Sequence, residues 1–186
     1  AIKYDVPESK FQALSGVVTI QKSLLQCVQQ CFKTNVNIDQ NSSKLDLESV
    51  VFQKMYFLNQ DDEQKFKELV EDGRLQDFCF AMHNCTRSPS PMIVSHRDFI
   101  VIGCLKVKEQ HASIVFESID YNETVKGVVR GKILNLHQIF TKIDDSKTEV
   151  FQFSVGDPCG NVPAWIYNAA LDSRNDILIN LKTQTE

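Results

Sequence analysis

The stretch that decides the fold lies near the end of the chain, where residues 157–168 read DPCGNVPAWIYN. Pro163 suits the first turn of a helix, because the N–H that it lacks would have no partner there, and Asn161 is a suitable cap. Small and apolar residues then recur at helical spacing. The stripe consists of Val162, Ile166, Ala169, Ala170, Ser173, Ile177 and Leu181. This pattern predicts a long C-terminal helix whose apolar face needs a partner surface.

The segments that precede this helix predict a large antiparallel sheet. Apolar, alternating runs between turn-like segments predict strands over residues 99–107, 112–119, 128–140 and 150–155. Further upstream, two hairpins are expected. The first pairs residues 17–20 with 31–38, and the second pairs 66–70 with 75–82 around Asp72-Gly73.

Between these hairpins, Ser42 and Ser43 precede apolar residues spaced three and four apart, which predicts an amphipathic helix of about four turns that ends near Leu58. The element order is β-β-α-β-β-β-β-β-β-α. It indicates an α+β fold in which a curved antiparallel sheet wraps around the terminal helix and either packs solidly or keeps a cavity. With 186 residues, 42% of them hydrophobic, residues 1–186 are expected to form a single domain.

Composition excludes several classes of function. A net charge of −4 without a basic stripe argues against nucleic acid as a partner. No stretch reaches the roughly 20 apolar residues of a membrane span, so any membrane contact is expected to be peripheral. The four histidines lack the i, i+4 spacing of a helical metal site, and no metal or cofactor is expected. The chain begins at Ala1 without a signal-like segment, which suits a mature product or an excised domain.

The cysteines and glycosylation sequons bear on the cellular compartment. No cysteine spacing indicates a disulfide scaffold, so we expect reduced and mostly buried thiols. The six cysteines are Cys27, Cys31, Cys79, Cys85, Cys104 and Cys159. Reduced thiols favour an intracellular, cytoplasmic protein that associates peripherally with membranes. Because glycosylation sequons lie at Asn41, Asn84 and Asn122, a secreted or exported protein remains the alternative.

Four ordered motifs resemble the START (StAR-related lipid transfer) domains, from about residue 15 to residue 182. Residues 15–20, SGVVTI, look like the family's first strand, and 91–99, PMIVSHRDF, resemble its P-x-x-x-S-x-R-D-[FY] strand opening. Residues 126–130, KGVVR, resemble the segment after its Ω-loop, and 157–168 resemble the start of the terminal helix in phosphatidylcholine-transfer members. The resemblance implies a helix-grip fold whose cavity holds one sterol or phospholipid. The terminal helix and the Ω-loop, placed at residues 120–125, would act as a lid.

Departures from the family pattern bear on the ligand. The buried arginine of sterol-binding members is expected six residues after the motif arginine, where this chain has Gly103, and its acidic partner is expected near His83 and Asn84. The choline cage of phosphatidylcholine-transfer members needs aromatic rings, but Trp165 is the only tryptophan. With the sterol-type ion pair missing, we expect a phospholipid rather than a sterol.

Candidate lipid contacts lie on strand faces and on the terminal helix. Arg97 shares its strand face with Phe99 and Val101 and is the first candidate for a polar contact, although a structural ion pair is the alternative role. Arg130 has the same two possible roles. The expected lipid-binding set is Arg97, Phe99, Val101, Gly103, Arg130, Phe151, Phe153, Ile166, Ala169 and Ala170.

These expectations favour a lipid-binding and transfer or sensing module that is not an enzyme. Its partners would be one lipid and, transiently, a membrane surface. Exposing the chains of a diacyl lipid to water costs about 0.8 kcal/mol per methylene, so a carrier with an apolar cavity would speed its exchange. The alternative is a helix-grip enzyme of the cyclase or hydrolase type acting on an apolar substrate, because fold does not fix function. Convergent acids or bases in the cavity would favour that alternative.

Overall fold

The computed structural model describes residues 1–7, 9–36, 52–86, 88, 92–122 and 125–171. Its strands are β1 (Ile2–Asp5), β2 (Gln12–Ile20), β3 (Phe52–Phe57), β4 (Phe78–Thr86), β5 (His96–Lys108), β6 (His111–Ser118), β7 (Val128–Arg130), β8 (Lys132–Asp144) and β9 (Lys147–Asp157). Its helices are α1 (Leu24–Val36), α2 (Gln60–Glu71) and α3 (Ala164–Ala170).

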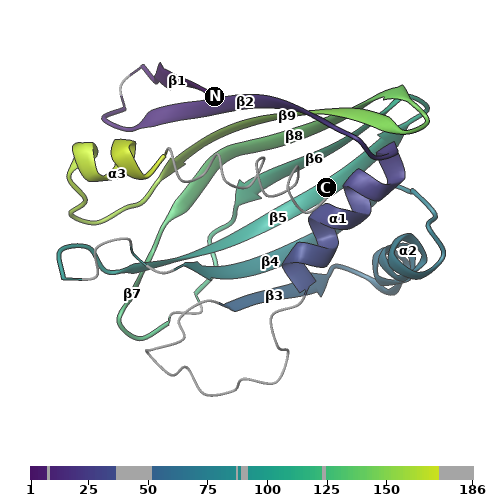
Figure 1. The fold of residues 1–186 in the computed structure, drawn as a ribbon. Helices are drawn as coiled ribbons and strands as arrows, with labels where there is room; N and C mark the ends of the chain where they lie inside the picture. Colours follow the sequence, from purple (N-terminus) through teal and green to yellow (C-terminus); the bar gives the residue numbers. More distant parts are fainter. Residues whose placement is uncertain (8, 37–51, 87, 89–91, 123–124, 172–186) are drawn as a thin grey trace.

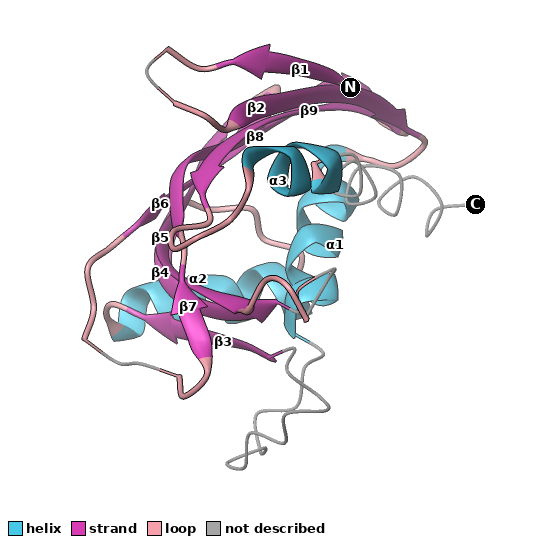
Figure 2. Cartoon of the chain, turned by 90° about the vertical axis from the view of Figure 1, so that its left-hand side faces the viewer, coloured by secondary structure: helices cyan, strands magenta, loops and turns pink. Residues whose placement is uncertain are grey.

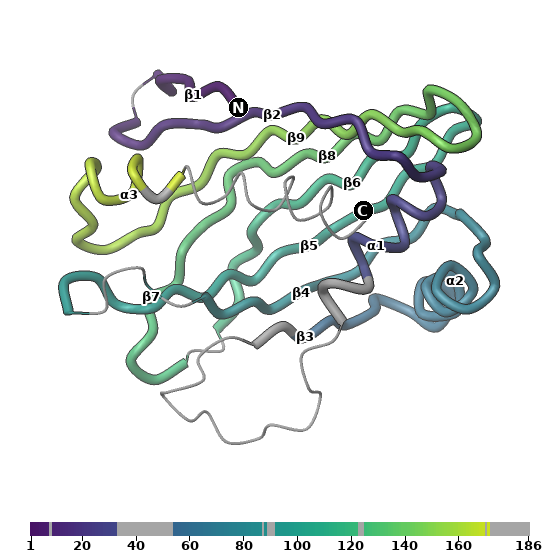
Figure 3. Tube along the Cα trace, in the orientation of Figure 1, coloured from purple at the N-terminus to yellow at the C-terminus, as the bar shows by residue number. Residues whose placement is uncertain are grey.

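All nine strands of the described residues belong to one sheet, with the order β1-β2-β9-β8-β6-β5-β4-β3 (Figure 1). The pairs along this path are antiparallel, and β7 lies off it, parallel to the start of β5. The trace in Figure 3 shows how the N-terminal strands return beside β9, so that early and late parts of the chain share one edge of the sheet. The expected α+β class and curved antiparallel sheet are therefore confirmed.

The sheet is strongly curved, and α1 and α3 lie on its concave side (Figure 2). Alternate residues of the strands point to this side and form the main core with one face of α1. The strands contribute Ile20, Phe78, Phe80, Met82, Val101, Leu105, Ala112, Ile114, Phe116, Phe140 and Val150, and α1 contributes Leu24, Cys27, Val28, Cys31 and Phe32. A second, smaller cluster at α3 consists of Phe11, Leu14, Val94, Val162, Ile166, Tyr167 and Leu171.

The predicted strand over residues 31–38 is wrong, because its described part belongs to α1. Ser23 and Gln26 form a reciprocal capping box, in which the Ser23 hydroxyl accepts from the Gln26 N–H and the Gln26 side chain accepts from the Ser23 N–H. The apolar residues from Leu24 to Phe32 then recur at helical spacing and face the core. This cap outweighs the local β-propensity of the residues that follow.

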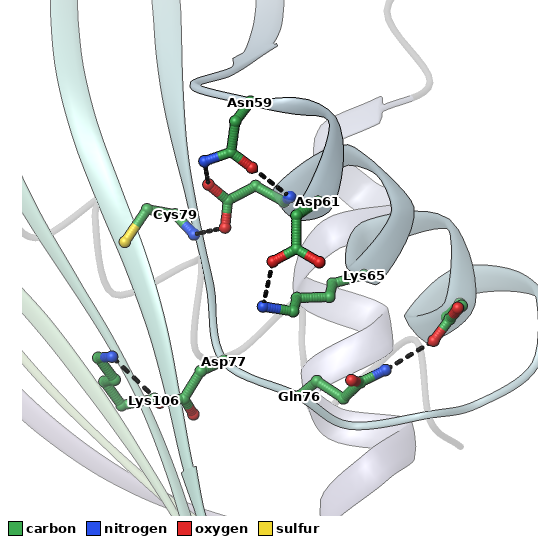
Figure 4. A network of polar contacts seen from close by, with 9 residues as sticks. Asn59, Asp61, Lys65, Gln76, Asp77, Cys79 and Lys106 are labelled. Atoms are coloured by element: carbon green, nitrogen blue, oxygen red, sulfur yellow. Dashed lines mark hydrogen bonds and ion pairs between the residues drawn. The ribbon is translucent and has the colours of Figure 1, made fainter.

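The predicted hairpin around Asp72-Gly73 is also wrong, because residues 60–71 form α2. Asn59 caps its start by accepting a hydrogen bond from the Asp62 N–H at 2.8 Å, and Gly73 has a positive φ of 70° just past its end. The Asp-Gly pair thus ends a helix, where a left-handed residue is favoured as much as in a hairpin turn. Figure 4 shows this end of the molecule, where α2 is joined to β4 by a hydrogen bond from the Cys79 N–H to the Asp62 carboxylate.

Other expected boundaries shift. Residues 52–57, predicted as the end of a helix, form β3, and residues 37–51 lie outside the described part of the chain. The strand expected over 128–140 is divided at Gly131 into β7 and β8. The terminal helix is described as α3 from Ala164, and the later members of its stripe lie outside the described residues.

The cysteines do not all remain thiols as expected. Cys79 and Cys104 lie directly opposite each other on β4 and β5 and form a disulfide. The 25-residue separation of this pair gives no sequence signal, because the strand register alone brings the two residues together. Cys27, Cys31 and Cys85 are buried and not disulfide-bonded, and burial raises the pKa of the Cys31 thiol to about 12.

No helix in the described part of the chain is long and apolar enough to cross a membrane.

Candidate functional site

Arg97 holds the segment that leads into α3. Its Nε donates to the Pro158 carbonyl at 2.6 Å, and its Nη2 donates to the Cys159 carbonyl at 3.0 Å. Its Nη1 donates to the Ser95 carbonyl, and also to the His96 carbonyl at 3.3 Å. Burial lowers the pKa of the guanidinium, which still remains charged at neutral pH. These contacts are those of a structural residue, although backbone carbonyls and not a carboxylate receive its hydrogen bonds.

The same segment turns sharply before α3. Cys159 and Gly160 have positive φ values of 52° and 64°, and the Asp157 carboxylate accepts from the Cys159 N–H at 2.7 Å. Beyond the turn, the Tyr167 hydroxyl donates to the Gly156 carbonyl at 3.0 Å, and Ile166 is buried in the α3 cluster. The turn and these contacts seat α3 against one end of the concave face.

A buried ionic group lies on the opposite face of the sheet. The Asp98 carboxylate accepts from Arg130 Nη2 at 2.8 Å, and His83 Nε2 lies 2.8 Å from the same oxygen. Burial alone would raise the Asp98 pKa, but the hydrogen bonds from Arg130 and His83 outweigh it and hold the pKa below its ordinary value. Arg130, like Arg97, therefore makes the contacts of a structural residue.

Arg130 also joins the predicted lid segment to the sheet. Its Nη1 donates to the Tyr121 carbonyl at 3.1 Å. Residues 118–122 and 130–132 together line a surface pocket of about 270 Å³. Within the described residues, the segment predicted as an Ω-loop is thus connected to β7 and β8.

The expected apolar contacts on β5 share the concave face. Val101 is fully buried in the main core, and Phe99 packs against it from the same side. Gly103 lies beneath the ring of Phe80, since a Cβ placed there would come within 2.5 Å of Phe80 Cζ. The position that carries an arginine in sterol-binding members is therefore covered by an aromatic ring.

The remaining expected residues are dispersed. Phe151 and Phe153 are half-buried and point away from the concave face, because the alternate residues Val150 and Gln152 occupy it. Ala169 is exposed on α3. The side chain of Ala170 lies outside the described residues. The structure thus groups Phe99, Val101, Gly103 and Arg97 on one face of β5, and it places Ile166 in the neighbouring cluster.

A polar patch on β8 and β9 was missed by the sequence reasoning. Gln138 and Gln152 are directly opposite each other on the concave face, and Gln138 Nε2 donates to Gln152 Oε1 at 2.8 Å. Ser154, two residues further along β9, is also buried. The alternation of β9 that places Val150 in the core could have identified Gln152 and Ser154 as inward-facing. We refer to Gln138, Gln152 and Ser154 as the polar patch.

No protein-family model and no curated protein sequence matches the chain. Solved structures do resemble it. A STAR-related lipid transfer protein from Xanthomonas axonopodis has a TM-score of 0.68 at 16% identity, with 98% of this chain and 90% of that chain covered. The human StarD13 (DLC2) lipid transfer and protein localization domain gives 0.66 at 13%, covering 97% and 80%. Human STARD10 gives 0.65 at 12%, covering 97% of this chain and 65% of that one. The chain therefore has the START-like, helix-grip fold that its motifs predicted.

Proposed function

We propose that the chain binds one lipid between the concave face of the sheet and its terminal helix, and carries it between membranes. The observation that carries the proposal is the concave face of the sheet. Apolar residues line this face from β2 through β9, β8, β6, β5 and β4 to β3, with α1 packed at one end of it and α3 at the other. Apolar walls of this kind are typical of sites for acyl chains or a sterol ring system. The likeness to lipid transfer proteins supports the same function.

An exposed apolar surface beside α3 supports the proposal of transfer. Met92 and Ile93 are 99% and 65% exposed, and Trp165 is 71% exposed. They adjoin Val94 and Ile166, which pack together in the α3 cluster, so the three exposed side chains lie at one end of the molecule. Apolar and tryptophan side chains of this kind partition into the membrane interface. We call Met92, Ile93 and Trp165 the apolar tip.

Binding is favoured over catalysis by the position of the acid–base groups. The buried pair His83 and Asp98 lies on the face of the sheet opposite to the proposed lipid site. In the described part of the chain, no group of three or more metal-ligating side chains is found. A reaction on a lipid held at the concave face would not have these groups within reach.

The preference for phospholipid over sterol stays a prediction of the sequence. It rests on the missing sterol-type ion pair, and Arg97, the first candidate for a polar contact, donates to backbone carbonyls instead. The compartment is also open to test. Disulfides persist in oxidising environments, so the Cys79–Cys104 pair favours the exported alternative over a cytoplasmic one.

Two measurements test the function. Native mass spectrometry of the purified chain should detect one bound lipid per molecule, and labelled lipid should move from donor to acceptor vesicles faster with the protein than without it. An unliganded spectrum together with unaccelerated transfer would refute the proposal.

A further inference from the structure

We infer that the polar patch is a hydrogen-bonding subsite for an uncharged, hydroxyl- or amide-bearing head group of the bound lipid. The inference rests on the proposed lipid-binding function and adds the chemistry that the site recognises.

The patch lies between the two apolar clusters. Along β9, it is flanked by Val150, which belongs to the main core. Across the sheet, Ser154 lies opposite Leu14 of β2, which belongs to the α3 cluster. Figure 1 shows β8 and β9 side by side, with α3 toward one end of them and α1 toward the other. The patch therefore interrupts an otherwise apolar wall at its middle.

The polar atoms of the patch are buried without full satisfaction. The Ser154 side chain belongs to a residue only 9% exposed, and its Oγ has no hydrogen-bond partner in the described part of the chain. Gln138 and Gln152 donate and accept one bond between them, and each primary amide can form more. Burying such groups is unfavourable unless they are hydrogen-bonded, and apolar residues would line the wall at lower cost. A ligand group that both donates and accepts would satisfy them.

The charges around the patch argue against a phosphate. Its neighbours in the register are uncharged: Leu14, Gly16, Val150, Gly156, Leu136 and Phe140. The donors of Arg97 are occupied by carbonyls, and Arg130 is paired with Asp98 on the opposite face. A phosphate at the patch would be a buried charge without a counter-charge, whereas a hydroxyl or amide carries no such penalty.

The test compares three labelled lipids, each carried in phosphatidylcholine vesicles: a sterol, a diacylglycerol and phosphatidylcholine itself. The full chain should extract the sterol or the diacylglycerol in preference to phosphatidylcholine. The variants are Ser154→Ala and the double change Gln138→Leu with Gln152→Leu. Each should weaken uptake of the preferred lipid about tenfold, the effect of losing one buried hydrogen bond. Ser113→Ala, on the opposite face of β6, is the matched control and should change nothing.

Folding is checked separately by thermal melting. The double leucine variant replaces both partners of one hydrogen bond by apolar groups of similar size, so it should melt close to the wild type. Ser154→Ala removes only one oxygen and serves if the double variant does not fold. Preferential uptake of phosphatidylcholine, or wild-type uptake by folded variants, overturns the subsite alone. Failure of the wild type to extract any of the three lipids overturns the proposed lipid-binding function, and the subsite with it.

Discussion

Arg97 joins β5 to the turn that precedes α3. Because Arg97→Leu leaves the Pro158 and Cys159 carbonyls without their charged donor, we expect the free energy of unfolding to fall by about 2–3 kcal/mol. Amide hydrogen exchange should accelerate most around residues 158–171. The ranking of lipids should not change, because the guanidinium donates to backbone carbonyls and makes no contact with the polar patch that would be lost.

Arg97→Lys is the informative control for this prediction. It keeps the charge but lacks the planar fork that reaches several carbonyls at once, so it should restore only part of the lost protection. A folded Arg97→Leu variant with wild-type exchange and an altered lipid ranking would return Arg97 to the role of a head-group contact.

Gly103 lies where the concave wall has no room for an added Cβ. A Cβ at this position would lie 2.5 Å from Phe80 Cζ, so we expect Gly103→Ala to lower the free energy of unfolding by about 1–3 kcal/mol. Adding Phe80→Leu should recover part of this loss, which urea denaturation of the two single variants and the double variant would measure. Strictly additive effects would contradict a direct clash between the two side chains.

At the scale of elements, Asp98 connects β5 with β4 and β7. Its pKa is held below the ordinary value by Arg130 and His83, so its contribution to stability is present at neutral pH and is lost as the pH falls through its folded-state pKa. We expect Asp98→Asn to be less stable than the wild type at pH 7, with the gap between them narrowing in acid.

Urea denaturation across a pH series measures this gap. Glu117→Gln, an exposed change on β6, is the control and should leave the pH profile unchanged. If the difference in the free energy of unfolding between Asp98→Asn and the wild type stayed constant as the pH fell, the carboxylate charge of Asp98 would contribute nothing to stability.

The Cys79–Cys104 disulfide connects β4 with β5 on the face away from the core. Replacing both cysteines by alanine opens a loop closed by residues 25 apart in the sequence. In the chain-entropy model, this lowers the free energy of unfolding by about 3 kcal/mol. Thermal melting of the variant and of the wild type would measure the loss. Under denaturing, non-reducing conditions the wild type should have four reactive thiols out of six cysteines, and six would show that the pair is reduced.

At the scale of the whole molecule, the apolar tip should direct one end of the protein toward membranes. Changing Met92, Ile93 and Trp165 to serine should weaken binding to vesicles and slow transfer, while the bound lipid is retained. Changing Val115 on β6 and Tyr56 on β3, which are also exposed, to serine is the control and should leave vesicle binding and transfer unchanged.

Trp165 also reports on the contact directly. It is the only tryptophan of the chain and is 71% exposed, so its fluorescence should shift to shorter wavelength when vesicles are added. An unchanged spectrum at a vesicle concentration that supports transfer would place the membrane contact elsewhere.

By itself, the sequence determined the class of fold and much of the sheet. The strands from β5 to β9 and the start of α3 followed from alternation, from the stripe after Pro163 and from ordered motifs, because these signals arise within one element. The errors occurred where one local signal suits two structures. Asp72-Gly73 fits a hairpin and a helix end equally well, and residues 31–36 have β-propensity within a helix that is fixed by a cap eight residues earlier.

Only the tertiary structure decided which polar residues meet. The disulfide, the contacts of Arg97 with the Pro158 and Cys159 carbonyls, and the Asp98 group all join residues distant in sequence, and these residues meet only in the folded sheet. The polar patch has the same origin, since Gln138 and Gln152 become neighbours only when β8 pairs with β9. A periodicity reports which side of an element is apolar, but the partner across the sheet is fixed by the summed packing of the whole core.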